Sequence, residues 1–312
     1  MLVPALLCAV SMVHAQTYPQ RPVRVVVNVS AGGGVDSIAR VIAQHYASVW
    51  GQPVVVDNRT GGGGSIGVET VTKAAPDGHT LLVSSSSVVT NAAVQPQGYD
   101  PVRDLKPITR LTSSPYIVAV TATLPVASVK ELLALGRGKP DRVSFASAGA
   151  GSITHMGAEL LTQMAGVPML HVPYKGVADA YPAVASGQVD WVIGNPVSVL
   201  AIIKAGRLKG IAVTSATCIA ALPQIPTVAE SGVPGYEVVG WYGMFAPVNV
   251  APAIIAKLNA EARNKLQSPE IARRMEVEVS EAVGNSPQQF AAEVKAEFEK
   301  WQELVRKRGI KL

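Results

Sequence analysis

The chain has 312 residues and a formal net charge of +5, with 48% hydrophobic and 16% charged residues. This length allows one large or two ordinary domains, and the composition is that of a globular protein rather than a disordered one. Aromatic residues make up only 5%, and the lysines and arginines are scattered, which argues against a nucleic-acid-binding surface. The excess positive charge suits an anionic small molecule instead.

The first 15 residues have the pattern of a secretory signal. An apolar run at residues 2–10 is followed by Val13, His14 and Ala15, which favours cleavage near Ala15. The run is too short to span a membrane, so we expect an exported, soluble protein. Only Cys218 remains after this cleavage, which excludes an internal disulfide and a thiolate metal cage.

A strand, a glycine turn and a helix follow. Residues 23–29 are mostly β-branched and apolar, which predicts a buried strand, and the apolar spacing over residues 38–49 predicts a helix ended by Gly51. Between them, three glycines allow a close approach to the free N–H groups of a helix N-terminus, which is a natural anion site. The alternative is that the glycines only form a tight turn. The candidate ligand-binding residues here are Ser30, Ala31, Gly32, Gly33, Gly34 and Asp36. For Asp36 a structural role is favoured, in which its carboxylate accepts hydrogen bonds from free N–H groups of the first helical turn.

The next elements repeat this alternation. Strands are predicted at residues 54–56 and 80–83, with a helix from about residue 65 to residue 75 between them and a surface loop at residues 101–107. The strand at residues 80–83 ends in a run of hydroxyl side chains. Ser84, Ser85 and Ser86 are therefore further candidates for ligand binding.

One motif favours an enzyme. Gly62, Gly64 and Gly67 satisfy the spacing Gly-x-Gly-x-x-Gly between a strand and a helix, as in an NAD-dependent dehydrogenase. However, the acidic residue expected at the end of the next strand is replaced by serines. We keep this dehydrogenase function as the alternative.

The second half of the chain contains a similar strand, turn and helix. A strand at residues 116–120 is predicted to cross into a second domain, and a strand at residues 143–146 is followed by a helix over residues 153–164. The small-residue turn between the last two, residues 147–152, is named the second loop, and residues 30–34 are named the first loop. Ser147, Ala148, Gly149, Gly151 and Ser152 are candidates, and His155 is either a ligand contact or a partly buried structural histidine.

Further helices are predicted at residues 128–135 and 178–186, a short strand and turn at residues 171–176, and a strand at residues 211–213. The remaining elements close the predicted fold. A strand at residues 189–193 leads to Asn195, and a strand at residues 240–245 returns to the first domain and contains Trp241; both residues are candidate ligand contacts. Only helices are expected afterwards, at residues 251–267 and from Ser286 onwards. The last helix has an apolar stripe typical of core packing, formed by Phe290, Val294, Phe298, Trp301 and Val305.

Strands alternating with helices predict an α/β fold with mostly parallel sheets, in which ligands bind at the carboxyl ends of strands. We expect residues 16–118 and 240–312 to form one domain and residues 119–239 to form the other. The five histidines are scattered, and no hydrolase elbow, metalloprotease motif or nucleotide P-loop occurs. No metal, cofactor or catalytic residue is therefore predicted.

Several short stretches resemble the periplasmic solute-binding proteins of tripartite tricarboxylate transporters, the Bug family. The matching stretches are residues 32–36, 51–59, 74–78, 146–149, 171–176, 187–190 and 222–227, in that order along nearly the whole mature chain. The resemblance implies a type II, clamp-like, two-domain binding protein that closes over a carboxylate without catalysis. It implies that the first and second loops bind carboxylate oxygens, largely through backbone N–H groups and bound waters. The expected partners are the ligand and the membrane components of such a transporter, with a monomeric receptor.

Three departures from the family pattern concern the ligand. Asn28 and Val29 stand where proline and phenylalanine are usual, Val35 replaces a hydroxyl residue, and Gly194 replaces an acidic or hydroxyl residue. These changes predict a smaller, less polar lining with room for a bulkier organic acid. Aliphatic dicarboxylates, aromatic carboxylates and acidic amino acids all remain candidate ligands.

Overall fold

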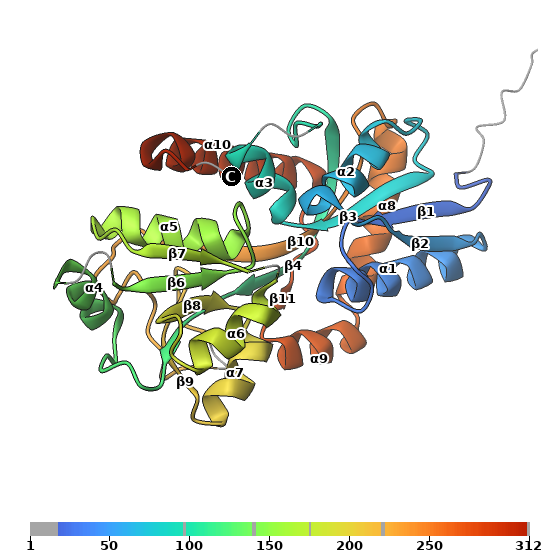
Figure 1. Cartoon of the computed structure of the whole chain (residues 1–312). Coiled ribbons are helices and arrows are strands. Elements are labelled where there is room, and N and C mark those ends of the chain that lie inside the picture. Colours follow the sequence, from blue (N-terminus) through green and yellow to red (C-terminus); the bar gives the residue numbers. More distant parts are fainter. Residues whose placement is uncertain (1–17, 96–97, 139–141, 175, 220–221, 311–312) are drawn as a thin grey trace, which may run out of the picture.

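The computed structural model describes residues 18–95, 98–138, 142–174, 176–219 and 222–310, so the predicted signal at residues 1–15 lies outside the described residues. Two β-sheets, each flanked by helices, make up the molecule (Figure 1). Sheet A has the strand order β11 (Glu281–Ala282), β4 (Leu105–Pro115), β10 (Val239–Pro247), β3 (Thr80–Ser85), β1 (Val23–Val27) and β2 (Val54–Asn58). Sheet B has the order β7 (Leu170–Pro173), β6 (Ser144–Ser147), β8 (Trp191–Gly194), β5 (Ile117–Thr121) and β9 (Leu208–Val213).

Both sheets are mixed, so the expectation of mostly parallel sheets is wrong. Strand β1 runs parallel to β2 and β3, but β10 runs antiparallel to both β3 and β4. In sheet B, β6 runs parallel to β7 and β8, whereas β5 runs antiparallel to β8 and β9. The physical reason is the connection: helical crossovers produce parallel neighbours, whereas β5 and β10 enter their sheets directly from the other sheet.

Both predicted crossovers between the sheets are present. Strand β4 of sheet A ends at Pro115 and β5 of sheet B begins at Ile117, so the chain passes between the sheets at Tyr116. It returns at Val239, where β10 begins. Thr214 joins the two passages, because its hydroxyl accepts a hydrogen bond from the Tyr116 N–H (2.8 Å) and donates one to the Val238 carbonyl (2.6 Å).

The helices follow the predicted alternation but are more numerous. Around sheet A they are α1 (Gly34–Trp50), α2 (Ser65–Thr72), preceded by a short 3₁₀ turn η1 (Gly62–Gly64), α3 (Ser87–Val94), α8 (Pro252–Leu266), α9 (Pro269–Glu278) and α10 (Pro287–Arg308). Around sheet B they are α4 (Val129–Gly138), α5 (Ile153–Ala165), α6 (Val177–Ala185) and α7 (Pro196–Lys204).

Five of these elements escaped prediction, namely β4, β11, α3, α7 and α9. The predicted surface loop at residues 101–107 is wrong in its second half, because β4 already begins at Leu105. The expectation of helices alone after β10 is wrong because β11 pairs with the edge of β4. The polar character of Ser84–Ser87 hid the start of α3, and β11 is too short to show any periodicity.

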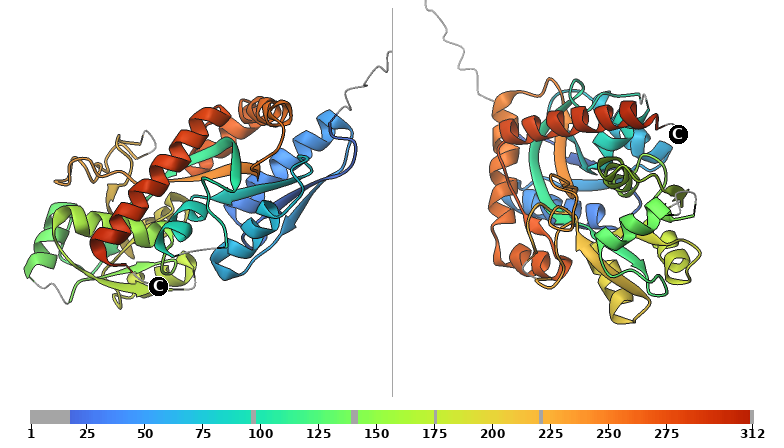
Figure 2. Two further views of the ribbon diagram at one scale, coloured as in Figure 1. Left: turned by 90° about the horizontal axis from the view of Figure 1, so that it is seen from above. Right: turned by 90° about the vertical axis from the view of Figure 1, so that its left-hand side faces the viewer.

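Helix α10 links the two halves of the molecule. It contacts α3 and β4 on the sheet A side and α5 on the sheet B side, and Figure 2 shows it running across both halves. Its capping box is present at Ser286 and Gln289. Phe290, Val294 and Trp301 of the predicted stripe are buried in the core, and Phe298 and Val305 are partly buried against it. At the far end, the guanidinium of Arg308 donates two hydrogen bonds of 3.0 and 2.9 Å to Glu159 of α5.

The burial of α10 predicts a large stability effect at its first turn. Phe290 is fully buried, and its ring lies against the backbone of Gly243 in β10, where no side chain would fit. Because a buried Phe→Ala substitution leaves a cavity, Phe290→Ala should cost about 3–5 kcal/mol of unfolding free energy in a urea titration followed by circular dichroism. Lys295→Ala, on the exposed face of the same helix, should change it by less than about 0.5 kcal/mol. Equal midpoints for both variants would show that α10 does not belong to the core.

Candidate ligand-binding site

The first loop is exposed and leads directly into α1. Helix α1 begins at Gly34 with Gly33 as its N-cap, and no side chain caps its first N–H groups. The three glycines serve different purposes. Gly32 has a φ of +88°, a left-handed conformation that favours glycine. Gly33 has an ordinary φ of −82°, and a Cβ added there would meet no atom nearer than 4.0 Å. A Cβ added at Gly34 would lie 2.5 Å from the Tyr242 hydroxyl. An uncapped helix N-terminus behind an open loop is a favourable place for an anion.

Asp36 holds this loop together from within. Its carboxylate is 3% exposed and accepts hydrogen bonds from the Gly32 N–H (2.9 Å), the Arg40 Nε (2.9 Å) and the Asn58 Nδ2 (3.0 Å). The hydrogen bond from Arg40 is the main reason that the pKa of Asp36 falls to about 2. The charge of Asp36 is therefore balanced within the protein, and the carboxylate shapes the loop rather than repelling a second anion.

The serine segment, Ser84–Ser87, lies beside the first loop. Strands β1 and β3 are neighbours with Val27 paired to Val83, so their carboxyl ends meet at the same edge. Ser84 and Ser86 are buried, whereas the partly exposed Ser85 and Ser87 share a hydrogen bond of 2.7 Å between their hydroxyls. Of Ser84, Ser85 and Ser86, the serines predicted to bind a ligand, only Ser85 is partly exposed, and Ser87, which was not predicted, is partly exposed as well.

Trp241 and its neighbour Tyr242 point to opposite faces of β10. Trp241 is 4% exposed; its indole N–H donates to Glu297 of α10 at 2.6 Å, and its ring packs edge-on against Phe290. Tyr242 instead places its hydroxyl beside Gly34 at the start of α1. Because side chains alternate along a strand, the residue next to the predicted one lies near the first loop. Tyr242, which the sequence analysis did not select, is therefore the residue of this strand that lies beside the first loop.

Asn195 and Gly194, at the end of β8, have structural contacts. The side chain of Asn195 caps α7 by accepting a hydrogen bond from the Val197 N–H at 3.0 Å. The backbone N–H of Asn195 donates a hydrogen bond to the Tyr181 hydroxyl at 3.1 Å. A Cβ at Gly194 would lie 2.9 Å from the same hydroxyl. The glycine thus makes room for Tyr181, which supplies a hydroxyl at this edge of sheet B.

The second loop connects β6 to α5 and is held by side chains. The Ala148 N–H donates to Thr154 (3.0 Å), the Gly149 N–H to Ser147 (3.1 Å) and the Gly151 N–H to the Nδ1 of His155 (3.1 Å). Ser152 is the N-cap of α5, and its hydroxyl accepts from the His155 N–H. Ala150, the exposed tip, has an N–H without an acceptor among the described residues.

Two imidazoles, the buried His155 and the half-buried His171, stack beside this loop. The rings of His155 and His171 lie 3.9 Å apart at an interplanar angle of 16°, and His171 also stacks on Phe145. Burial, with a smaller effect of His171, lowers the pKa of His155 to about 3, and burial lowers the pKa of His171 to about 4. His155 is 4% exposed, so it lies behind the loop.

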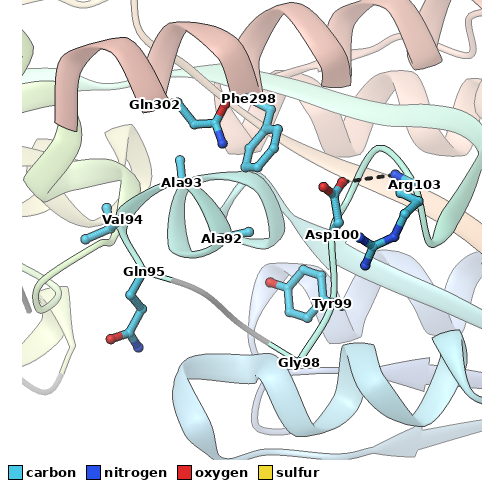
Figure 3. Close-up of a pocket in the computed structure, with 10 residues that line it drawn as sticks. All are labelled: Ala92, Ala93, Val94, Gln95, Gly98, Tyr99, Asp100, Arg103, Phe298 and Gln302. Carbon is cyan, nitrogen blue, oxygen red and sulfur yellow. Dashed lines mark hydrogen bonds between the residues drawn. The ribbon is translucent and has the colours of Figure 1, made fainter. Parts of the chain in front are cut away.

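Two cavities lie elsewhere in the molecule, and neither is lined by residues of the first or second loop. One of about 510 Å³ lies between α3 and α10 and is lined by Tyr99, Phe298 and Gln302, among others (Figure 3). Another of about 690 Å³ lies beside the crossovers, between the ends of β4 and α9 and the segment around Cys218. The ligand site is therefore assigned from the geometry of the loops.

The structure also bears on metal binding, on membrane spanning and on the dinucleotide-binding motif. Within residues 18–95, 98–138, 142–174, 176–219 and 222–310, no cluster of three or more potential metal ligands occurs. Over the same residues, no helix combines the length and hydropathy that crossing a membrane requires. In the Gly-x-Gly-x-x-Gly motif, the carbonyls of Gly63 and Gly64 accept hydrogen bonds from Asn91 (2.8 Å) and Asn28 (3.4 Å), so this turn is built into the sheet edge.

The two stacked histidines predict a pH-dependent stability. In the unfolded chain they titrate near pH 6.5, whereas the fold keeps both neutral down to about pH 4. Below pH 6.5 the unfolded state therefore binds more protons, and the free energy of unfolding should fall with a slope approaching about 1.4 kcal/mol per pH unit for each histidine. Urea titrations between pH 7 and 5 should show this decline, and His155→Asn should reduce the slope. A flat profile would mean that the pair is protonated in the folded state.

Comparisons with known proteins agree with this architecture. The family described as "Tripartite tricarboxylate transporter family receptor" matches residues 38–310. A protein from the tcbD-tcbE intergenic region of Pseudomonas sp. (strain P51) is 37% identical over 96% of this chain and 91% of its own length. Protein BugT of Bordetella pertussis is 34% identical over 96% of this chain and 93% of its own length.

Solved structures are similar over nearly the whole chain. The Rhodopseudomonas palustris protein MatC, solved with malate, has a TM-score of 0.80 at 30% identity and covers 92% of this chain and 100% of its own. An R. palustris protein solved with adipate has a TM-score of 0.82 at 34% identity and covers 94% of this chain and 99% of its own. With this fold, these loops and a family match over most of its length, the chain belongs to the receptor family of the tripartite tricarboxylate transporters.

Proposed function

We propose that the protein is a periplasmic solute-binding protein that captures a small carboxylate between its two halves and delivers it to a tripartite tricarboxylate transporter. The observation that carries this proposal is the exposed first loop in front of the uncapped N-terminus of α1. Backbone N–H groups and the helix dipole stabilise a carboxylate there. Asp36 occupies the Gly32 N–H, and Arg40 balances its charge.

The ligand class follows from the relatives and from the loops. Two similar receptors were solved with adipate and with malate, both dicarboxylic acids. A dicarboxylate suits two anion-binding loops on different sheets, since each carboxylate then meets its own set of donors. Val35 at the first loop is buried and offers no hydroxyl, so the backbone dominates recognition there.

The domain division proposed here is residues 16–118 with 240–312, and residues 119–239; the passages between the sheets, at Tyr116 and Val239, lie within two residues of these bounds. Its support is the pair of crossovers, which meet at Thr214 and form the natural pivot. Tyr116 lies against Gly240 at this point, where a Cβ would collide with its ring. Closure about such a pivot would bring the first and second loops onto one ligand.

The protein is proposed to act without catalysis, as a monomer, after removal of a signal peptide cleaved near Ala15. A serine–histidine pair, Ser147 with His171 at 2.7 Å, does lie at the second loop, but its serine is fully buried. Binding alone is sufficient for a receptor. A thermal-shift screen over organic acids tests this directly, because a ligand that binds only the folded state raises the melting temperature.

Gly33→Val should remove binding without unfolding the protein. An added Cβ at Gly33 meets nothing nearer than 4.0 Å within the protein, but it would obstruct a ligand approaching the N–H groups of the first loop. Losing two charge-assisted hydrogen bonds, at about 1.5–3 kcal/mol each, weakens binding on the order of a hundredfold or more. Calorimetry with the best acid from the screen measures this. Gly138→Val, in an equally open position at the end of α4, is the control and should bind normally.

Ligand should also make the protein more compact. If the halves close about Thr214, the radius of gyration measured by X-ray scattering should decrease by a small but resolvable amount at saturating ligand. Gly33→Val should show no such change at the same ligand concentration. Identical scattering curves for the wild-type protein with and without a confirmed ligand would contradict the clamp mechanism.

A further inference from the structure

We propose that His155, stacked on His171, is the positioning residue of the second loop, and that it presents the Ala150 N–H to the ligand. His155 does not touch the ligand in this proposal. It acts through Gly151, and the inference rests on the proposed function because it concerns how the second half-site meets a carboxylate.

The stacked pair holds both ends of the second loop. At the start, the Nε2 of His171 and the hydroxyl of Ser147 lie 2.7 Å apart, and that hydroxyl also accepts from the Gly149 N–H at 3.1 Å. At the end, the Nδ1 of His155 accepts from the Gly151 N–H at 3.1 Å. Because the two rings lie 3.9 Å apart, the two anchors cannot move independently.

This anchoring decides which donor remains at the tip. The N–H groups of Ala148, Gly149 and Gly151 are all held by side chains, whereas Ala150 is exposed between them. The left-handed conformations of Gly149 (φ +108°) and Gly151 (φ +77°) turn the chain sharply on either side of Ala150. Ala150 therefore carries, at an exposed position, the one N–H of residues 148–152 that has no acceptor among the described residues.

The role requires an imidazole that is neutral and protonated only at Nε2, because its Nδ1 must accept a hydrogen bond. The surroundings favour that state. The groups that face the pair are Phe145 of β6, Glu159 of α5 and, beyond Glu159, Arg308 of α10. Glu159 lies 3.9 Å from the Nε2 of His155 but makes its close ion pair with Arg308 at 2.9 Å. The negative charge next to the histidines is thus balanced by arginine and does not draw a proton onto His155.

Two substitutions separate an acceptor from a packing role. His155→Asn places an amide oxygen near the position of Nδ1 and cannot be protonated at neutral pH, whereas His155→Phe keeps the ring and its stacking but has no acceptor. Affinities for adipate and malate are measured by calorimetry at pH 7.5. The proposal expects His155→Asn to bind within about threefold of the wild-type protein, and His155→Phe to bind at least about tenfold more weakly.

A spectroscopic measurement tests the same contact without ligand. The ¹⁵N shifts of the wild-type imidazoles should show an unprotonated Nδ1 and a protonated Nε2 at His155 between pH 5 and 8. The Gly151 amide should exchange slowly in the wild-type protein and in His155→Asn, and faster in His155→Phe. This readout remains decisive if His155→Phe proves too unstable for calorimetry.

The outcomes distinguish the two proposals. If the wild-type protein binds none of the organic acids tested, the proposed function fails. If it binds and Gly33→Val does not, but His155→Phe binds as well as the wild-type protein, then only the positioning role is wrong. A protonated Nδ1 at His155 would overturn it as well.

Discussion

One constraint governs both strand-to-helix loops, which is that the turn must be held in shape while some backbone N–H groups stay without a partner among the described residues. The two loops meet it in different ways. The first loop uses the carboxylate of Asp36, balanced by Arg40, to fix Gly32 and leaves the α1 N-terminus uncapped. The second loop uses neutral acceptors, Thr154 and His155, because a buried charge there would have to be paired as well.

The two sheets that carry these loops are connected in two ways. Two passages of the chain meet at Thr214, while α10 contacts α3 on one side and α5 on the other. The Arg308–Glu159 pair at the end of α10 therefore joins the half that carries the first loop to the helix that carries His155.

Local signals allowed a good part of this to be predicted. The apolar runs and caps located β1, α1, β6, α5 and α10 to within a few residues, and they placed both loops at strand ends. Short or polar elements could not be predicted from the sequence. Helix α3 begins within the serine run, and the two residues of β11 become a strand only by pairing with β4.

By itself, the sequence determined the α/β class, the two passages between sheets and the glycine-rich turns, because each depends on residues close together in the chain. Only the tertiary structure decided that the sheets are mixed, that Tyr242 rather than Trp241 lies beside the first loop, and that His155 lies behind the second. These features arise from contacts between distant segments, such as Trp241 with Glu297 and His155 with His171. Spacing along the chain carries no information about which distant partner a side chain will meet.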